Sequence, residues 1–92
     1  MICSFRHRGL KRLYERSNAS GIRPDLLNKV RTILARLDAA QSLDGLRVPA
    51  FRLHALKGDM KGYWAVTVRA NWRIIFRFED GHAYDVELID YH

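Results

Sequence analysis

Alternating apolar and polar residues between Tyr63 and Leu88 predict three antiparallel strands. The alternating segments are GYWAVTV, WRIIFRF and HAYDVEL, and the short segments RAN and EDG separate them. Successive side chains of a strand point to opposite faces of a sheet, so we expect the apolar positions of all three segments on one face. These positions are Trp64, Val66, Val68, Trp72, Ile74, Phe76, Phe78, Tyr84, Val86 and Leu88.

Turn length decides whether this apolar face stays continuous. A two-residue turn at the dipeptide DG would place Phe76 opposite Asp85, against the apolar pattern. A three-residue turn, EDG, removes the conflict and puts Gly81 where a left-handed residue is needed. The same length at RAN gives Asn71 the left-handed position, which asparagine tolerates. The sequence therefore predicts two three-residue turns.

Two helices are predicted before the sheet. Residues 6–16 carry apolar side chains on one side, although Gly9 weakens this helix by about 1 kcal/mol relative to alanine. The second helix is expected to begin at Arg23-Pro24-Asp25, because proline suits a first turn and an acid suits the positive end of the helix dipole. Apolar residues at helical spacing then form one stripe, interpreted as core: Leu26, Leu27, Val30, Ile33, Leu34 and Leu37.

The remaining segments complete an α+β domain. Residues 1–5 predict a short strand at the side of the sheet, and a helical turn is expected near Leu43. Residues 51–55 alternate and predict a fourth strand with Phe51, Leu53 and Ala55 toward the core. We expect a single domain, residues 1–92, with two N-terminal helices packed on one face of a mostly antiparallel sheet.

The other face of the sheet is expected to be polar. It collects Arg52, His54, Tyr63, Thr67, Arg73, Arg77, Asp85 and Glu87. Thr67, Arg73 and Glu87 are expected in one row across the strands. Arg73 can either touch an anionic ligand there or pair with Glu87 on a solvated face, and spacing alone favours the solvated face because antiparallel sheets often have one side in water.

Composition narrows the class of partner. The net charge of +6 favours nucleic acid, an anionic membrane surface or an acidic protein, and does not choose among them. The single cysteine, Cys3, excludes an internal disulfide and a multi-cysteine metal site, and we expect it to be a buried structural thiol. No apolar run reaches the roughly 20 residues that span a bilayer, and the opening residues are too short and too quickly basic to predict a secretory signal. A cytoplasmic location is therefore expected.

Several side chains on or near the open face suit phosphate chemistry. Histidine exchanges protons near neutral pH, lysine and arginine stabilise phosphate charge, and tyrosine stacks on bases. Such a set suits RNA cleavage by attack of a 2′-hydroxyl on the neighbouring phosphate. The candidates for catalysis are His54, Lys57, Arg73, Asp90, Tyr91 and His92, and those for RNA binding are Lys57, Lys61 and Arg73.

Each of these residues also has an ordinary structural interpretation, as a solvated side chain or as part of a frayed chain end. No ligand spacing typical of a metal site is found, and no cofactor is expected. The residues alone thus indicate a basic α+β domain that binds RNA.

The motif LxxLKGxxxGYWxxxVxxNWRIxF over residues 53–76, the opening MICSFRHRGLKRLYE and the terminal Asp90-Tyr91-His92 resemble HigB-type toxins of the RelE superfamily. The resemblance covers essentially the whole chain and is weakest over residues 17–48. It implies a RelE-like fold and a ribosome-dependent endoribonuclease that cuts messenger RNA in the ribosomal A site and stops translation, without a metal ion.

The resemblance also implies roles and partners. His54 and Asp90 would transfer protons, Lys57 and Arg73 would stabilise the phosphate, and Tyr91 with His92 would position the nucleotide. The implied partners are a HigA-type antitoxin with a helix-turn-helix domain, the ribosome and messenger RNA, with operator DNA reached only through the antitoxin and no membrane. Two alternatives stay open: a ParE-like inhibitor of DNA gyrase without a nuclease site, and a non-catalytic RNA- or ribosome-binding module.

Overall fold

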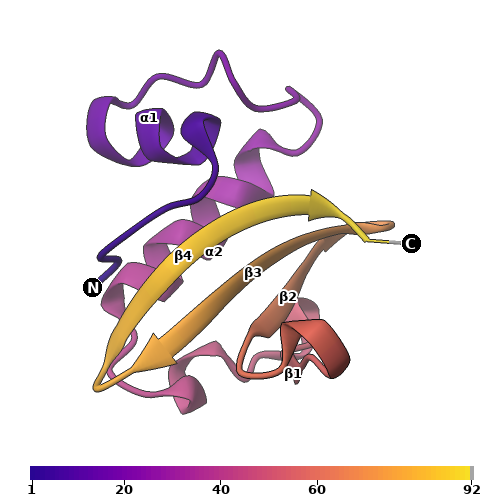
Figure 1. Ribbon diagram of the computed structural model, residues 1–92. Helices are drawn as coiled ribbons and strands as arrows, with labels where there is room; N and C mark the ends of the chain where they lie inside the picture. The colour runs from indigo at the N-terminus through magenta and orange to yellow at the C-terminus, as the bar shows by residue number, and fades with distance from the viewer. Residues whose placement is uncertain (92) are drawn as a thin grey trace.

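The computed structural model describes residues 1–91 and contains two helices followed by a four-stranded antiparallel sheet (Figure 1). The strand order is β1-β2-β3-β4. The elements are α1 (Arg8–Arg16), α2 (Leu27–Ala39), β1 (His54–Ala55), β2 (Trp64–Arg69), β3 (Trp72–Glu79) and β4 (His82–Asp90), with short 3-10 turns η1 (Leu43–Leu46), η2 (Pro49–Phe51) and η3 (Gly58–Met60). The predicted α+β class is confirmed, as is the order of two helices followed by four strands.

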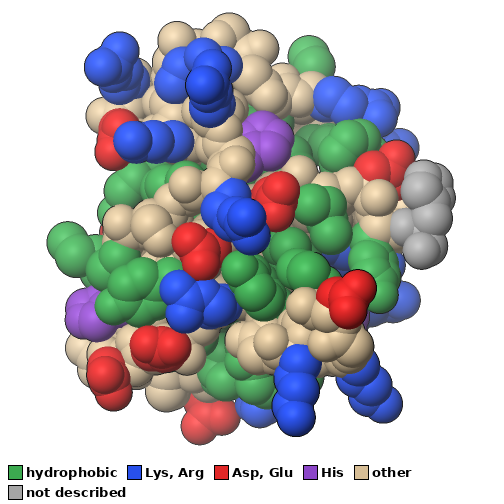
Figure 2. Space-filling model, in the orientation of Figure 1, with side chains coloured by type: hydrophobic (Ala, Val, Ile, Leu, Met, Phe, Trp, Pro, Cys, Tyr) green, Lys and Arg blue, Asp and Glu red, His purple; other side chains and the backbone are tan. Residues whose placement is uncertain are grey.

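The two faces of the sheet have different surroundings. In Figure 1 the sheet passes in front of α2, so this view looks onto the face that the helices leave open. Figure 2 shows the same side with hydrophobic, basic and acidic side chains intermixed. The helices therefore cover only one face of the sheet, as the apolar stripe of α2 predicts.

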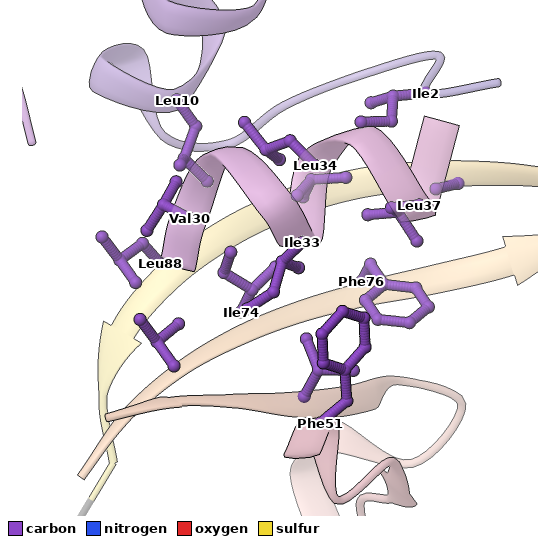
Figure 3. Packing of buried hydrophobic residues seen from close by; sticks show 14 of the residues in the cluster. Ile2, Leu10, Val30, Ile33, Leu34, Leu37, Phe51, Ile74, Phe76 and Leu88 are labelled. Carbon is purple, nitrogen blue, oxygen red and sulfur yellow. The ribbon is translucent and has the colours of Figure 1, made fainter. Parts of the chain in front are cut away.

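The main core lies between α2 and the covered face. Figure 3 shows Ile33 and Leu37 of α2 directed at Ile74 and Phe76 of β3, and Leu10 of α1 beside α2. All five side chains are 0% exposed. Burying a side chain of this size contributes about 1.5–3 kcal/mol, so this contact is a main source of stability.

The turn between β3 and β4 has two residues, so the predicted three-residue turn is wrong. Glu79 pairs with His82, and both turn residues are left-handed, with φ of 50° at Asp80 and 80° at Gly81. Two left-handed central residues match the right-handed twist of a hairpin. The apolar conflict that this turn creates is removed by a bulge at Asp85, whose φ is 55°.

The bulge changes which residues of β4 face the core. Ala83 is 0% exposed and belongs to the core cluster, whereas Tyr84, expected there, is only half-buried. Beyond the bulge the pairing places Arg73 opposite Ile89, and Glu87 lies opposite Ile75. The expected pairing of Arg73 with Glu87 is therefore wrong.

The β2–β3 turn is also tighter than expected. Thr67 pairs with Arg73 as predicted, but the register shifts and Arg69, not Val68, pairs with Trp72. Ala70 has a φ of 50° and takes the left-handed position expected for Asn71. The register shift between Thr67 and Arg69 compensates for the shorter turn, as the bulge at Asp85 does in the next hairpin.

The N-terminal segment lies beside β4, at the side of the sheet as predicted. It forms two isolated parallel bridges, Ile2 with Ala83 and Phe5 with Val86, instead of a continuous strand. The expectation that Cys3 is buried is wrong, because this thiol is exposed.

The predicted fourth strand is shortened to the two residues of β1. Phe51 belongs to the turn η2, and Arg52 is left-handed with a φ of 49°, so extended backbone begins only afterwards. Ala55 is exposed, contrary to its predicted core position, and Leu56 is buried instead.

Candidate active site

Two rows of paired residues define the centre of the open face. Directly paired residues point to the same side of a sheet. One row runs through His54, Ala65, Ile75 and Glu87, and the next through Thr67, Arg73 and Ile89. Strand spacing and rise per residue then put the backbone positions of His54 and Arg73 about 12 Å apart. Both residues face the same side, as the alternation predicts.

The ring of His54 is exposed and oriented by the backbone just before it. Its Nδ1 lies 3.0 Å from the carbonyl oxygen of Arg52. A carbonyl oxygen only accepts, so Nδ1 must be the donor. The neutral ring then presents Nε2 as a proton acceptor. The local geometry of residues 52–54 thus favours the tautomer that a general base requires.

Lys57 and Lys61 are exposed at the two ends of a loop that is fastened to the open face. The backbone N–H of Leu56 donates to the carbonyl of Tyr63 over 2.9 Å, and that of Met60 donates to the carbonyl of Lys57 over 3.3 Å. A second apolar cluster lies beneath the loop: Leu56, Ala65 and Ile75 are buried, and Met60, Tyr63 and Ile89 pack against them.

This second cluster was not predicted, although the signal was present. Ala65 and Ile75 have the same alternation parity as Arg73, so two apolar residues interrupt the polar face. Their burial holds the loop of Lys57 against the sheet, and this contact fixes one phosphate-binding candidate relative to the other.

Arg73 is half-buried and folds back onto the turn of its own hairpin. Its Nη1 donates to the carbonyl of Ala70 over 2.5 Å and to that of Trp72 over 3.1 Å. Both bonds use one nitrogen of a guanidinium that has five N–H groups. This arrangement orients the group and, within residues 1–91, leaves Nε and Nη2 without a protein acceptor.

Asp90 and Tyr91 contact the β2–β3 hairpin along the edge of β3 that pairs with β4. Asp90 pairs with Trp72, whose ring packs on the main core, so Asp90 starts on the helix side of the sheet. Tyr91 is 45% exposed, and its backbone N–H donates to the carbonyl of Asn71 over 2.7 Å. In Figure 1 the C-terminal end of β4 lies beside the β2–β3 turn.

The predicted site residues therefore fall into two groups. His54, Lys57 and Lys61 belong to β1 and the loop after it, whereas Asp90 ends β4, the opposite edge strand, and Tyr91 follows it. Strand spacing separates β1 from β4 by about 14 Å, so the fold does not bring His54 and Asp90 into contact. Arg73 lies between the groups on β3. His92 lies outside the described residues.

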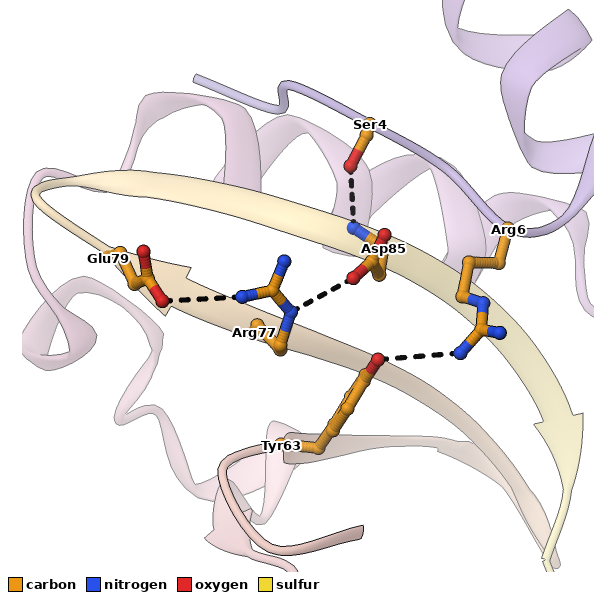
Figure 4. A network of polar contacts seen from close by, with 6 residues as sticks. All are labelled: Ser4, Arg6, Tyr63, Arg77, Glu79 and Asp85. Carbon is orange, nitrogen blue, oxygen red and sulfur yellow. Dashed lines mark hydrogen bonds and ion pairs between the residues drawn. The ribbon is translucent and has the colours of Figure 1, made fainter.

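A separate polar network occupies the other end of the open face (Figure 4). Arg77 donates from Nε to Asp85 over 2.9 Å and from Nη1 to Glu79 over 3.3 Å. The hydrogen bond to Asp85 raises the pKa of the Arg77 guanidinium. Arg6, which the sequence did not assign to this face, reaches the hydroxyl of Tyr63 over 3.5 Å. Arg77 is thus neutralised by partners in the protein and is a poor anion site.

Charge is distributed unevenly along the chain. Residues 1–40 contain nine Lys or Arg and three Asp or Glu, whereas residues 41–92 contain seven of each. The whole excess charge therefore lies in the helical half, and Figure 2 shows blue and red side chains interleaved over the sheet. Anion binding on the open face must rest on individually placed cations.

Two further features bear on function. Within residues 1–91, no group of three or more His, Cys, Asp or Glu side chains is placed to hold a metal ion. In the same part of the chain, neither helix has the length and apolar character needed to cross a bilayer.

Comparison with known proteins identifies the family. Residues 3–92 match the family described as the RelE-like toxin of the type II toxin-antitoxin system HigB. The chain belongs to this family. It is 45% identical over 92 residues to the Endoribonuclease HigB of Proteus vulgaris, covering 100% of both chains. It is 32% identical over 90 residues to Toxin HigB-1 of Vibrio cholerae serotype O1, covering 96% of this chain and 95% of that one.

Solved structures confirm the RelE-like fold of this HigB-like toxin. A YoeB–YefM complex from Staphylococcus aureus matches with a TM-score of 0.63 at 17% identity, over 100% of this chain and 95% of that chain. A YafQ variant from E. coli matches with a TM-score of 0.62 at 20% identity, over 96% and 89%. Membership of a two-component toxin–antitoxin system also gives the protein an antitoxin as its partner.

Proposed function

We propose that this HigB-like toxin is an endoribonuclease that cuts messenger RNA in the ribosomal A site and so stops translation. The observation that carries the proposal is the 45% identity, over the full length of both chains, with a protein named Endoribonuclease HigB. The shared open face of His54 and Arg73, with Lys57 in the adjoining loop, supplies suitable chemistry.

In the proposed reaction the 2′-hydroxyl loses a proton and attacks the neighbouring phosphorus, and the 5′-oxygen leaves after gaining a proton. Nε2 of His54 takes the first proton. Lys57 and Arg73 hold the phosphate and stabilise its developing charge, with Lys61 as a further RNA contact. Asp90 supplies the second proton, for which its side chain must reach around the edge of β4 from the helix side to the open face, and Tyr91 with His92 positions the nucleotide.

The separation of the two groups of residues is compatible with this scheme. An in-line displacement has its entering and leaving oxygens on opposite sides of phosphorus, so the base and the acid must approach from opposite sides. Three strand spacings and an offset of three residues put the backbone positions of His54 and Asp90 about 18 Å apart, which leaves space for RNA between them. His54 and the C-terminal residues would then act together only when an RNA strand is bound between them.

The ribosome would hold the RNA in place. Residues 41–92, which form the sheet, have no excess positive charge, and few groups on the open face can orient an RNA strand. Holding reactants in line is worth several orders of magnitude in rate, and a ribosome already holds its message. The proposed setting is the cytoplasm, and the proposed antitoxin is of HigA type, with a helix-turn-helix domain that reaches operator DNA.

The test is 5′-end mapping of messenger RNA after brief induction of the wild type, Arg73→Ala and Arg47→Ala. Arg47 is a matched control because it is exposed, follows η1 in the connector after α2, and is paired with Asp44 at 3.3 Å. We expect in-frame cuts within translated regions for the wild type and the control, and a loss of about 10²-fold or more for Arg73→Ala. Growth arrest with intact messages would overturn the proposal and point to gyrase or another binding target.

A further inference from the structure

Asp25 does not have the role that its place in the sequence predicts. Helix α2 begins at Leu27, has no side-chain cap, and has no acidic residue in its first turn. The carboxylate therefore does not cap this helix. It accepts two hydrogen bonds from Arg23, 3.1 Å from Nε and 3.0 Å from Nη2, and lies 3.6 Å from Nη1 of Arg69.

These two arginines connect Asp25 to both strands of the β2–β3 hairpin. Arg69 is the last residue of β2, and it pairs with Trp72 at the start of β3. The guanidinium of Arg23 lies over the ring of Trp72, 5.5 Å from its centroid. The segment before α2 thus holds the closing pair of the hairpin through a carboxylate and a stacked cation.

The turn that this pair closes is hydrogen-bonded to two of the candidate site residues, Arg73 and Tyr91. Its three successive carbonyl groups, at residues 70, 71 and 72, all accept hydrogen bonds from Arg73 or Tyr91. The direction of these carbonyls fixes the guanidinium of Arg73 on one side and the start of the C-terminal residues on the other. A small rotation of the turn would move both groups together.

We propose that Asp25 is a positioning residue for RNA cleavage, which acts through Arg23 and Arg69 on the turn at residues 70–72. The inference rests on the proposed nuclease function. Asp25 itself does not contact RNA. Its three-residue cluster is exposed, so it contributes little to folding. Its effect is on the geometry of Arg73 and Tyr91, where a shift of about 1 Å can cost 10²-fold in rate.

Asp25→Asn is a sharp test because the two possible effects have opposite signs. The substitution keeps the shape and removes a negative charge. Simple electrostatics predicts tighter RNA binding and no loss of rate. Loss of positioning predicts a three- to tenfold lower kcat on ribosome-bound message, an unchanged KM, and a thermal midpoint within about 4 °C of the wild type. Asp25→Glu, which keeps the carboxylate, should recover most of the rate.

Asp44→Asn is the matched control, because Asp44 is also an exposed carboxylate paired with an arginine, Arg47, at 3.3 Å. It should leave kcat unchanged. An unchanged or raised kcat for Asp25→Asn would overturn the proposal, as would an equal loss in the control.

Amide NMR signals separate this inference from the nuclease proposal. Asp25→Asn should shift the amides of residues 70–72 and Tyr91, whether or not the protein cuts RNA. If the wild type cuts no message while these amides shift, the nuclease function fails and the link to the turn stands. If the wild type cuts message and the amides stay unchanged, positioning by Asp25 is overturned even when kcat falls.

Discussion

Arg77 fastens the bulge of β4 by donating a 2.9 Å hydrogen bond from Nε to Oδ2 of Asp85. Asp85 has a φ of 55°, and its backbone N–H donates to the hydroxyl of Ser4 over 2.8 Å. These two contacts hold a left-handed residue inside a strand. The bulge lets a two-residue turn coexist with Ala83 and Val86 on the core face.

Asp85→Val should lower the free energy of unfolding by about 2–3 kcal/mol. A β-branched residue resists the left-handed conformation, and the bond to Arg77 is lost as well. Asp85→Asn should cost about 1 kcal/mol or less, since asparagine tolerates this conformation. Urea unfolding measures both values, and equal costs for the two variants would contradict the role of the backbone conformation.

Gly9→Ala should destabilise the protein although alanine is the better helix former. Helix propensity alone predicts a gain of about 1 kcal/mol. However, a Cβ on Gly9 would lie 2.6 Å from the carbonyl oxygen of Gly21. The backbone of Gly21 cannot move aside without a large energetic cost. We therefore expect the free energy of unfolding to fall by about 1–3 kcal/mol, measured by thermal or urea unfolding. Lys11→Ala, on the exposed side of α1, is the control and should be nearly neutral.

Tyr14→Phe should lower the thermal midpoint at pH 7 by about 5 °C, a loss of about 1 kcal/mol. The hydroxyl of Tyr14 donates to Oδ1 of Asp38 over 2.6 Å, and the backbone N–H of Ile2 donates to the same oxygen over 3.0 Å. The bond from Tyr14 lowers the pKa of the Asp38 carboxyl, and it raises the pKa of Tyr14 to about 12.

The two pKa shifts define the pH range in which the contact between Tyr14 and Asp38 stabilises the fold. A lowered carboxyl pKa stabilises the fold above its unfolded value of 3.8, and this contribution is lost as pH falls through the folded value. The raised pKa of the Tyr14 phenol stabilises the fold below pH 10.0, and this contribution is lost as pH rises toward about 12. The midpoints of wild type and Tyr14→Phe should therefore converge in acid and above pH 10.0. A constant difference from acid to alkali would show that the contact does not titrate.

Leu56→Ala should reduce RNA cleavage more than its cost in stability explains. Leu56 is 8% exposed and holds the loop of Lys57 on Ala65 and Ile75. We expect a loss of about 2 kcal/mol in urea unfolding, at the low end for such truncations. Leu13→Ala, in α1 and 6% exposed, is the control for a similar truncation away from the site. Equal losses of cleavage in the two variants, at equal folded fractions, would contradict the anchoring role.

Local periodicity was enough to predict much of this molecule. The apolar stripe of α2 and the alternation of β2 and β3 place the core residues correctly, because each side chain's face follows from its own position in a helix or strand. The same parity puts His54 and Arg73 together on the open face, and the motif over residues 53–76 indicates the family.

The tertiary structure alone decided the turns, the register of β4 and the connections of the site. The strain at Asp85 is held by Ser4, far away in the sequence, and the turn beside Arg73 is held by Asp25. Such contacts join residues whose separation no periodic pattern encodes, since they depend on how distant segments meet in space. The sequence determined which side chains share a face, and the packed chain determined which of them contact one another.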